Sequence, residues 1–130
     1  MCKNIYSIFI LFLFIVFSGG IMSAENKELI YLHLKDGRVV IETMPKVAPN
    51  HVKRIKSLAL EGQFDGVVFH RVINGFMAQT GDVKFGNSNN NDFNLELAGT
   101  GGSNLPNLKS EFSDLQHKRG AVSMARSQDP

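Results

Sequence analysis

The segment from Phe69 to Asp82 constrains the fold of this chain more than any other, because two β-prone runs flank a strong turn signal. The dipeptide Asn74-Gly75 lies at its centre, and both residues tolerate the positive φ angles that tight hairpin turns require. Residues 67–73 and 76–80 are rich in β-branched and aromatic side chains, which favour strands. We therefore predict a strand at 67–73, a turn, and a second strand at 76–80 that folds back on the first.

This predicted hairpin brings unlike side-chain chemistry together. Alternation along a strand puts Phe69 and Arg71 on one face and His70 on the other, so we interpret His70 as structural rather than as an acid–base group. The turn would bring Phe76 and residues 77–79 near Arg71. A permanently charged guanidinium beside an apolar surface suits binding of a small apolar ring next to an amide carbonyl. Taken alone, the same residues also fit an exposed arginine in a salt bridge and an ordinary apolar core.

A second hairpin is predicted earlier in the chain. Residues 28–35 and 38–43 are both β-prone, and Asp36-Gly37 joins them. Two β-prone runs joined by Asp-Gly are the strongest short-range hairpin signal. One face of the first run carries Ile30, Leu32 and Leu34.

One helix is predicted after this hairpin. Pro49 fits its first turn, where the missing N–H costs nothing, and Gly62 lies where a C-terminal cap belongs. The apolar residues at helical spacing between them are Val52, Ile55, Leu58 and Ala59. The basic residues Lys53, Arg54 and Lys56 occupy the rest of the helix, and we interpret them as a solvated face rather than a partner surface.

The remaining segments complete a mainly β fold class. Residues 81–94 and 99–108 are rich in Gly, Asn and Ser, which predicts two surface loops, and residues 120–125 predict a short strand. The glycines at 99–102 lack the Lys-Ser or Lys-Thr ending of a P-loop. Strands outnumber helices, without the regularly alternating helices of a parallel sheet. The architecture predicted is an antiparallel β-barrel capped by one helix.

Composition and charge argue against several function classes. Fourteen Lys plus Arg against twelve Asp plus Glu give a net charge of +2, and no basic stripe with interleaved aromatics is present, so we predict no nucleic-acid binding. The four histidines are scattered without metal-ligand spacing, so we predict no metal. The single cysteine, Cys2, precedes the predicted domain, so we expect no disulfide, no thiolate nucleophile and no cysteine-bound metal in it.

Residues 1–24 have the pattern of a secretory signal peptide. Lys3 supplies positive charge, residues 8–17 are an unbroken apolar run, and small residues lead to a predicted cleavage after Ala24. The apolar run has about ten residues, whereas roughly 20 are needed to span a bilayer. We therefore predict a domain at 25–130 that is exported, and periplasmic if the host is bacterial. The alternative is an uncleaved N-terminus that contacts or anchors to the membrane.

The segment 69–82 resembles the active-site signature of the cyclophilins, a family of peptidyl-prolyl cis–trans isomerases. The similarity runs from about Leu29 to Pro130. Its other matching segments are 47–52, 64–69, 99–102 and 120–126. The resemblance implies a cyclophilin-like barrel and isomerisation of X–Pro bonds without a cofactor. It also implies proline-containing polypeptides as partners, and assistance to the folding of exported proteins.

The resemblance further implies roles for six residues. Arg71 would be the catalytic donor to the nitrogen of the twisting X–Pro bond. Substrate binding is implied for Phe76, Met77, Gln79, Ala125 and Arg126. Phe76 and Met77 would line the pocket for the proline ring, Gln79 would hydrogen-bond the substrate backbone, and Ala125 would offer backbone contacts. Arg126 stands where many family members carry Asn, so their side-chain contacts are not carried over to it.

The chain ends at Pro130, in what resembles the middle of a cyclophilin domain. We therefore expect a fragment or a truncated gene, an incomplete barrel, and weak or absent activity of the 130-residue polypeptide by itself. Two alternatives from other classes are a non-catalytic prolyl-peptide-binding or chaperone module, and an inactive fragment without a stable fold.

Overall fold

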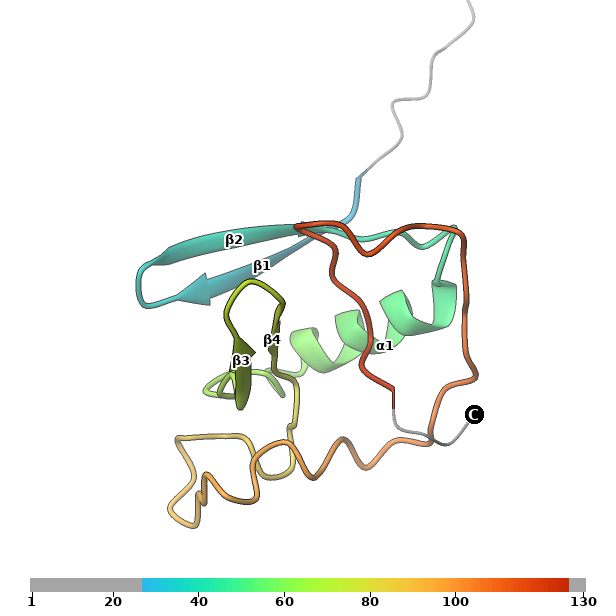
Figure 1. Cartoon of the computed structure of the whole chain (residues 1–130). Coiled ribbons are helices and arrows are strands. Elements are labelled where there is room, and N and C mark those ends of the chain that lie inside the picture. The colour runs from blue at the N-terminus through green and yellow to red at the C-terminus, as the bar shows by residue number, and fades with distance from the viewer. Residues whose placement is uncertain (1–26, 127–130) are drawn as a thin grey trace, which may run out of the picture.

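A computed structural model describes residues 27–126 of the chain, and the predicted signal peptide lies outside that range. The elements follow in the order β1, β2, α1, β3, β4. Figure 1 shows the β1–β2 hairpin above α1, with the shorter β3–β4 hairpin beside the helix. The last part of the described chain, in orange and red, passes the N-terminal end of α1 and then crosses in front of the helix.

The first hairpin confirms the prediction with a shift of one residue at its turn. Strand β1 (Leu29–Leu34) pairs antiparallel with β2 (Gly37–Glu42), and Leu34 pairs with Gly37. The turn is therefore made by Lys35 and Asp36, and Gly37 is the first paired residue of β2. Its φ of +146° is a conformation that a side chain would disfavour.

The two faces of this hairpin differ as the alternation predicts. Ile30 pairs with Ile41 and Leu32 with Val39, and this face is the more buried one. On the other face, the guanidinium of Arg38 lies 4.8 Å from the ring centroid of Tyr31.

Helix α1 (Pro49–Leu60) begins and ends where the sequence predicts. Pro49 occupies the first turn, and Leu58 is the buried apolar residue of the helix, 7% exposed. At the C-terminal end, Gly62 has φ +70° and its N–H donates to the Ala59 carbonyl at 3.1 Å. The Gln63 N–H donates to the Leu58 carbonyl at 2.9 Å. This pair of hydrogen bonds is the Schellman motif that a glycine at this position favours.

The N-terminal end of α1 is capped by a residue sixty positions away. Ala48 at the N-cap position provides no side-chain hydrogen bond. Instead, Glu111 Oε1 accepts from the Asn50 N–H at 3.0 Å, and Glu111 Oε2 accepts from the His51 N–H at 3.0 Å. The same oxygens lie 2.6 Å from Asn50 Nδ2 and 2.6 Å from His51 Nδ1. A carboxylate here satisfies unpaired helical N–H groups and complements the positive end of the helix dipole.

These contacts determine the ionisation of Glu111. Burial alone would raise the pKa of its carboxyl, but the hydrogen bonds from His51 and Asn50 outweigh it and lower the pKa to about 2. Glu111 is therefore ionised throughout the neutral range and joins the last part of the described chain to α1.

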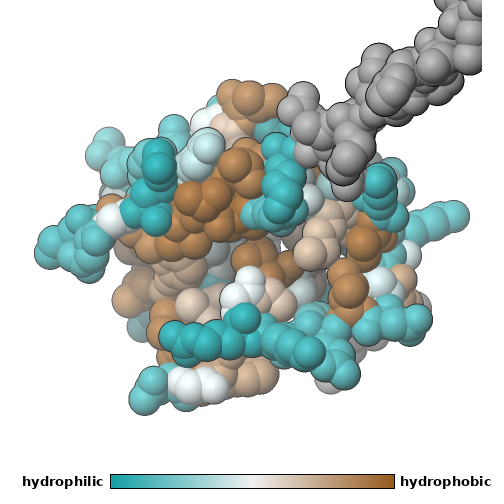
Figure 2. All heavy atoms as spheres, turned by 90° about the horizontal axis from the view of Figure 1, so that it is seen from above, coloured by the Kyte–Doolittle hydropathy of each residue, from teal (hydrophilic) through white to brown (hydrophobic). Residues whose placement is uncertain are grey.

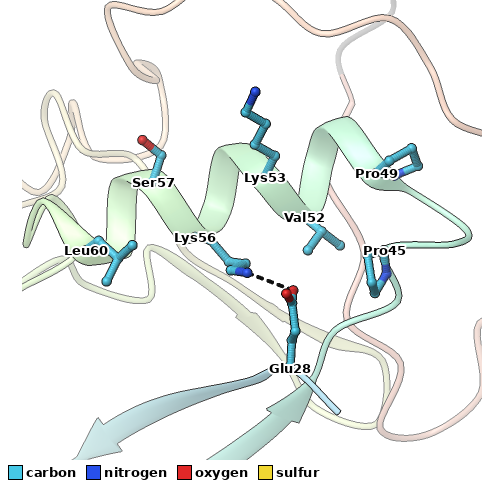
Figure 3. Close-up of a pocket in the computed structure, with 8 residues that line it drawn as sticks. All are labelled: Glu28, Pro45, Pro49, Val52, Lys53, Lys56, Ser57 and Leu60. Carbon is cyan, nitrogen blue, oxygen red and sulfur yellow. Dashed lines mark ion pairs between the residues drawn. The ribbon is translucent and has the colours of Figure 1, made fainter. Parts of the chain in front are cut away.

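The basic face of α1 is not simply solvated, which corrects the prediction for two of its three residues. Lys53 is exposed, but Arg54 Nη2 donates to the Pro106 carbonyl at 3.0 Å. Lys56 Nζ lies 2.7 Å from Glu28 Oε2, next to the start of β1, as Figure 3 shows. The helix therefore uses two of its cations to hold neighbouring segments.

The second hairpin exists but is shorter than predicted. Strand β3 covers Arg71–Ile73 and β4 covers Met77–Gln79, and the two pair antiparallel. Before β3, Val67 forms an isolated bridge with Asn87 instead of continuing the ladder. The Val68 N–H donates to the Gly86 carbonyl, and the Val68 carbonyl accepts from Thr80 Oγ1, both at 2.9 Å. These partners replace the longer ladder predicted for residues 67–73.

The mainly β class with one helix holds, but the closed barrel does not form among residues 27–126. Strands β1–β2 and β3–β4 make two separate two-stranded sheets. Residues 120–125 were predicted as a short strand and are not one, because they find no ladder partner among the described residues. Only Leu58 is a buried hydrophobic residue there, and Figure 2 shows apolar surface exposed between hydrophilic side chains. The predicted incompleteness of the barrel stays a prediction.

Within the described range, no helix has the length and apolar character needed to cross a membrane.

We predict that Glu111→Gln lowers the free energy of unfolding of the full-length protein in urea. Because the folded-state pKa is below the ordinary 4.5, the contribution of the carboxylate is fully present above about pH 4.5. It is lost as the pH falls toward about 2, so the difference between wild type and variant should shrink over that interval. Glu96→Gln is the matched control, since Glu96 is exposed. A difference that is the same at pH 7 and pH 2.5 would contradict the assignment.

Candidate functional site

The β3–β4 hairpin decides which of the predicted site residues share a face. Its register pairs Arg71 with Gln79, Val72 with Ala78 and Ile73 with Met77. The turn closes when the Phe76 N–H donates to the Ile73 carbonyl at 3.1 Å. Gly75 has φ +72°, and no other kind of residue in the described range has a positive φ. The sequence predicted that both Asn74 and Gly75 could adopt a positive φ. In the structure only Gly75 of these two does so.

Arg71, Met77 and Gln79 lie on one face of this hairpin. Directly opposite residues of an antiparallel pair point to the same side, and so do residues two apart along a strand. Arg71 Nη1 is 3.5 Å from Gln79 Oε1, which is the long limit of a hydrogen bond. Arg71 is exposed, whereas Met77 and Gln79 are half-buried. The face therefore combines a solvated charge, an amide and a thioether.

Arg71 keeps most of its hydrogen-bonding capacity in the described structure. Among residues 27–126, no carboxylate lies within ion-pair distance of its guanidinium. The alternative interpretation of Arg71 as a surface salt bridge is therefore not seen in this range. A guanidinium has five N–H donors in a planar fork and stays protonated, so it is available to a carbonyl oxygen or an amide nitrogen of a bound chain.

The other predicted site residues lie outside the paired strands. Phe76 is in the turn and is 77% exposed. Ala125 and Arg126 are exposed in an irregular segment at the end of the described range. The guanidinium of Arg126 lies 5.4 Å from the ring centroid of Phe112. The roles implied for these three residues remain predictions.

His70, directly before β3, is half-buried and lies against Gly99 of the loop formed by residues 99–102, here called the glycine loop. Its Nδ1 is buried and has no hydrogen-bond partner within the described residues. A Cβ added to Gly99, whose φ is +96°, would collide with the His70 ring. The close approach of the Gly99 backbone therefore requires glycine, and it agrees with a structural rather than a catalytic role for His70.

Asp82 is a site-adjacent residue to which the sequence analysis assigned no role. It lies three positions after Gln79 and is 3% exposed. Each of its carboxylate oxygens accepts two backbone hydrogen bonds, from Lys84 and Phe85 at Oδ1 and from Gly99 and Gly101 at Oδ2. Burial alone would raise the pKa of Asp82, but these hydrogen bonds lower it below its ordinary value.

Part of this arrangement had a local signal in the sequence. Asp82 Oδ1 accepts from Lys84 N–H two positions later at 3.0 Å, which is the turn that Asp favours at its first position. The contacts to Gly99 and Gly101 had no such signal, because they span 17 and 19 residues.

Arg71 does not line the groove that the structure shows beside α1. This groove is open, has a volume of about 360 Å³ and lies between α1 and the start of the β1–β2 hairpin, as Figure 3 shows. Pro45, Pro49, Val52 and Leu60 form its apolar part. Residues 27–126 hold no group of three or more His, Cys, Asp or Glu side chains arranged to bind a metal ion.

Comparison with known proteins gives one family. Residues 29–130 match the family described as cyclophilin type peptidyl-prolyl cis-trans isomerase/CLD. A protein of Brucella abortus (strain 2308), named "Probable peptidyl-prolyl cis-trans isomerase", is 55% identical over 83% of this chain and 55% of its own length. Peptidyl-prolyl cis-trans isomerase B of Escherichia coli (strain K12) is 33% identical over 78% of this chain and 56% of its own. No solved structure matches the chain significantly.

The chain belongs to the cyclophilin-type peptidyl-prolyl cis–trans isomerase family, as its 69–82 signature led us to expect. It spans about half the length of the Brucella and Escherichia relatives.

We predict that Gly75→Ala lowers the free energy of unfolding of the full-length protein by about 1 kcal/mol, the order of the cost of a left-handed conformation for a residue with a Cβ. Nothing lies within 4 Å of the added Cβ, so the backbone conformation is the cause and not a clash. Gly75→Asn should cost less, because Asn enters this conformation more readily. Urea unfolding measures both, and equal losses for Ala and Asn would contradict this explanation.

Proposed function

We propose that the complete gene product that contains residues 1–130, here called the full-length protein, is a peptidyl-prolyl cis–trans isomerase in which Arg71 is the catalytic donor. Family membership supports the reaction class. The observation that carries the assignment to Arg71 is its place in the β3–β4 hairpin. It shares a face with Met77 and Gln79 and has no ion-pair partner among residues 27–126.

The reaction requires no covalent intermediate. Rotation about a peptide bond is slow because resonance stiffens it, with a barrier of about 18–20 kcal/mol. In the twisted state the imide nitrogen regains its lone pair and becomes a better hydrogen-bond acceptor. A guanidinium N–H aimed at that nitrogen stabilises the twisted state more than either planar state, which lowers the barrier.

The neighbouring side chains supply binding and orientation in this proposal. Met77 is half-buried and polarizable, and with Phe76 it would contact the apolar proline ring. The Gln79 amide lies at the same end of the hairpin as Arg71 and would hold the substrate backbone while the proline rotates. Ala125 and Arg126 would contact the substrate chain further along. Substrates are proline-containing polypeptides, and folding of exported proteins is the physiological role that we propose.

We predict that Arg71→Ala lowers kcat/KM for an Ala-Pro-Phe peptide by about 100-fold or more, as for loss of a donor aimed at a transition state. Arg71→Lys should lose a large part of the activity as well, because an ammonium keeps the charge but not the planar fork. A protease-coupled assay on the full-length protein measures both. Arg119→Lys, at an exposed position outside the helix and the strands, is the matched control and should leave kcat/KM unchanged.

Peptide binding measured on the same variants separates this proposal from its alternative. Wild-type turnover by Arg71→Ala would overturn the role of Arg71. A wild-type protein that binds prolyl peptides but does not accelerate isomerisation would instead establish a non-catalytic binding or chaperone module.

We also propose that the protein is exported and that residues 1–24 are removed. The charged start, the apolar run and the small residues before Glu25 support this. N-terminal sequencing of protein from the periplasmic fraction of a Gram-negative host should begin at Glu25. Ala24→Trp should block this cleavage, since signal peptides require a small residue at the cut. Wild-type protein that keeps Met1 and sediments with membranes would support the uncleaved anchor.

A further inference from the structure

Asp82 connects two loops that are distant in sequence through one buried charge. It is the buried charged residue of the described range, and four backbone N–H groups compensate it at distances between 2.8 and 3.0 Å. A buried carboxylate is costly unless it is hydrogen-bonded, so these four donors are a condition for its presence there. The Oδ1 side holds the turn after β4, and the Oδ2 side holds the glycine loop.

The Oδ1 side of Asp82 leads back to the start of the β3–β4 hairpin. The turn that begins at Asp82 closes when the Gly86 N–H donates to the Asp82 carbonyl at 2.9 Å. The Gly86 carbonyl then accepts from the Val68 N–H at 2.9 Å, three residues before Arg71. The turn held by Asp82 therefore joins the segments that enter and leave the hairpin.

The Oδ2 side of Asp82 also leads to the segment before β3, through the glycine loop. Its two contacts hold Gly99 and Gly101, and Gly99 lies against the ring of His70. His70 is the residue directly before Arg71. The glycine loop thus contacts the residue before β3, while Asp82 itself lies three residues after the end of β4.

The contacts of Asp82 hold the open end of the β3–β4 hairpin. This end carries Arg71 and Gln79. Each strand has three paired residues, and a two-stranded hairpin of this size is marginal by itself. Arg71 and Gln79 are the pair farthest from the turn, where a short ladder opens first. Their relative position therefore depends on what holds residues 68–70 and 80–82 together.

We propose that Asp82 is a positioning residue for the isomerase, whose carboxylate holds the glycine loop and the turn after β4 against the open end of the hairpin and so keeps Arg71 opposite Gln79. This inference rests on the proposed function of Arg71. Asp82 itself does not touch the substrate.

A pair of glycine substitutions tests this without altering any charge. A Cβ at Gly101 would lie 2.7 Å from Asp82 Oδ1 and 2.8 Å from Phe85 Cδ2, so Gly101→Ala should push the loop away from the carboxylate. A Cβ at the adjacent Gly102 would meet nothing within 4 Å, which makes Gly102→Ala the matched control. Neither glycine has a positive φ, so the two substitutions differ in this contact rather than in backbone strain.

A second pair changes the carboxylate. Asp82→Asn keeps one accepting oxygen, but its NH2 group would face two N–H donors that need an acceptor. Asp92→Asn removes the same charge from an exposed position in the same loop and is its control. If Asp82→Asn does not fold, Gly101→Ala carries the test, because it leaves the carboxylate in place.

Two readouts on the folded full-length variants separate positioning from general stability. We expect Asp82→Asn and Gly101→Ala to lower kcat/KM by about 10- to 100-fold, the scale of a misplaced catalytic group, while the two controls retain wild-type activity. We also expect the NMR resonances of the Arg71 Nε–H and the Gln79 side-chain amide to shift or broaden in these two variants only.

The outcomes distinguish the two proposals. If the Arg71 variants lose activity but folded Asp82→Asn and Gly101→Ala turn over like wild type with unchanged Arg71 and Gln79 resonances, the positioning role is overturned and the proposed function stands. A wild-type protein without isomerase activity would overturn the proposed function and the positioning role with it.

Discussion

The register of the β3–β4 hairpin is the constraint on which the candidate site depends. Side chains alternate with a period of two, so a slip of one residue would place Arg71 on the face of Ala78 instead of the face of Met77 and Gln79. Three pairs of residues specify this register weakly by themselves. The turn strengthens it, because Gly75 is the turn residue that adopts a positive φ and the Ile73–Phe76 hydrogen bond closes on that conformation. The chemistry proposed for Arg71 is thus a consequence of backbone geometry at a glycine four residues away.

Two carboxylates join segments of this fold that are distant in the sequence. Leu58 is the buried hydrophobic residue of the described range, and many large apolar side chains are exposed. Glu111 joins the last part of that range to the start of α1, and Asp82 joins the glycine loop to the end of β4. In both cases the hydrogen bonds lower the pKa of the carboxyl, so both contacts stay charged at neutral pH. Hydrogen bonds to a charged acceptor are stronger than those between neutral groups, and unlike apolar burial they are directional, which suits the positioning of loops.

The sequence predicted what is local and missed what is distant. The Asp-Gly and Asn-Gly signals located both hairpins, and Pro49 and Gly62 located both ends of α1, because each depends on a few adjacent residues. The turn signal also predicted that residues 77–79 lie near Arg71, and the observed register adds that Met77 and Gln79 share its face. The ends of the strands were predicted too long, since Val68 pairs with Gly86 and Thr80 rather than with a ladder partner. The contacts of Glu111 and Asp82 were missed because sixty and nineteen residues separate the partners, and no local pattern encodes them.

The four hydrogen bonds to the Asp82 carboxylate are hard to predict from the sequence, because the side chains of the donor residues take no part in them. All four donors are backbone N–H groups, so the side chains of Lys84 and Phe85 are free to vary without loss of the hydrogen bonds. The arrangement requires particular residues only at the acceptor, Asp82, and at Gly99 and Gly101. Gly101 must lack a Cβ because Asp82 Oδ1 occupies that space, and Gly99 must lack one because of its φ and the His70 ring. An aspartate after a strand and two glycines about eighteen residues later are therefore the pattern to look for, with the glycines as its more restrictive part.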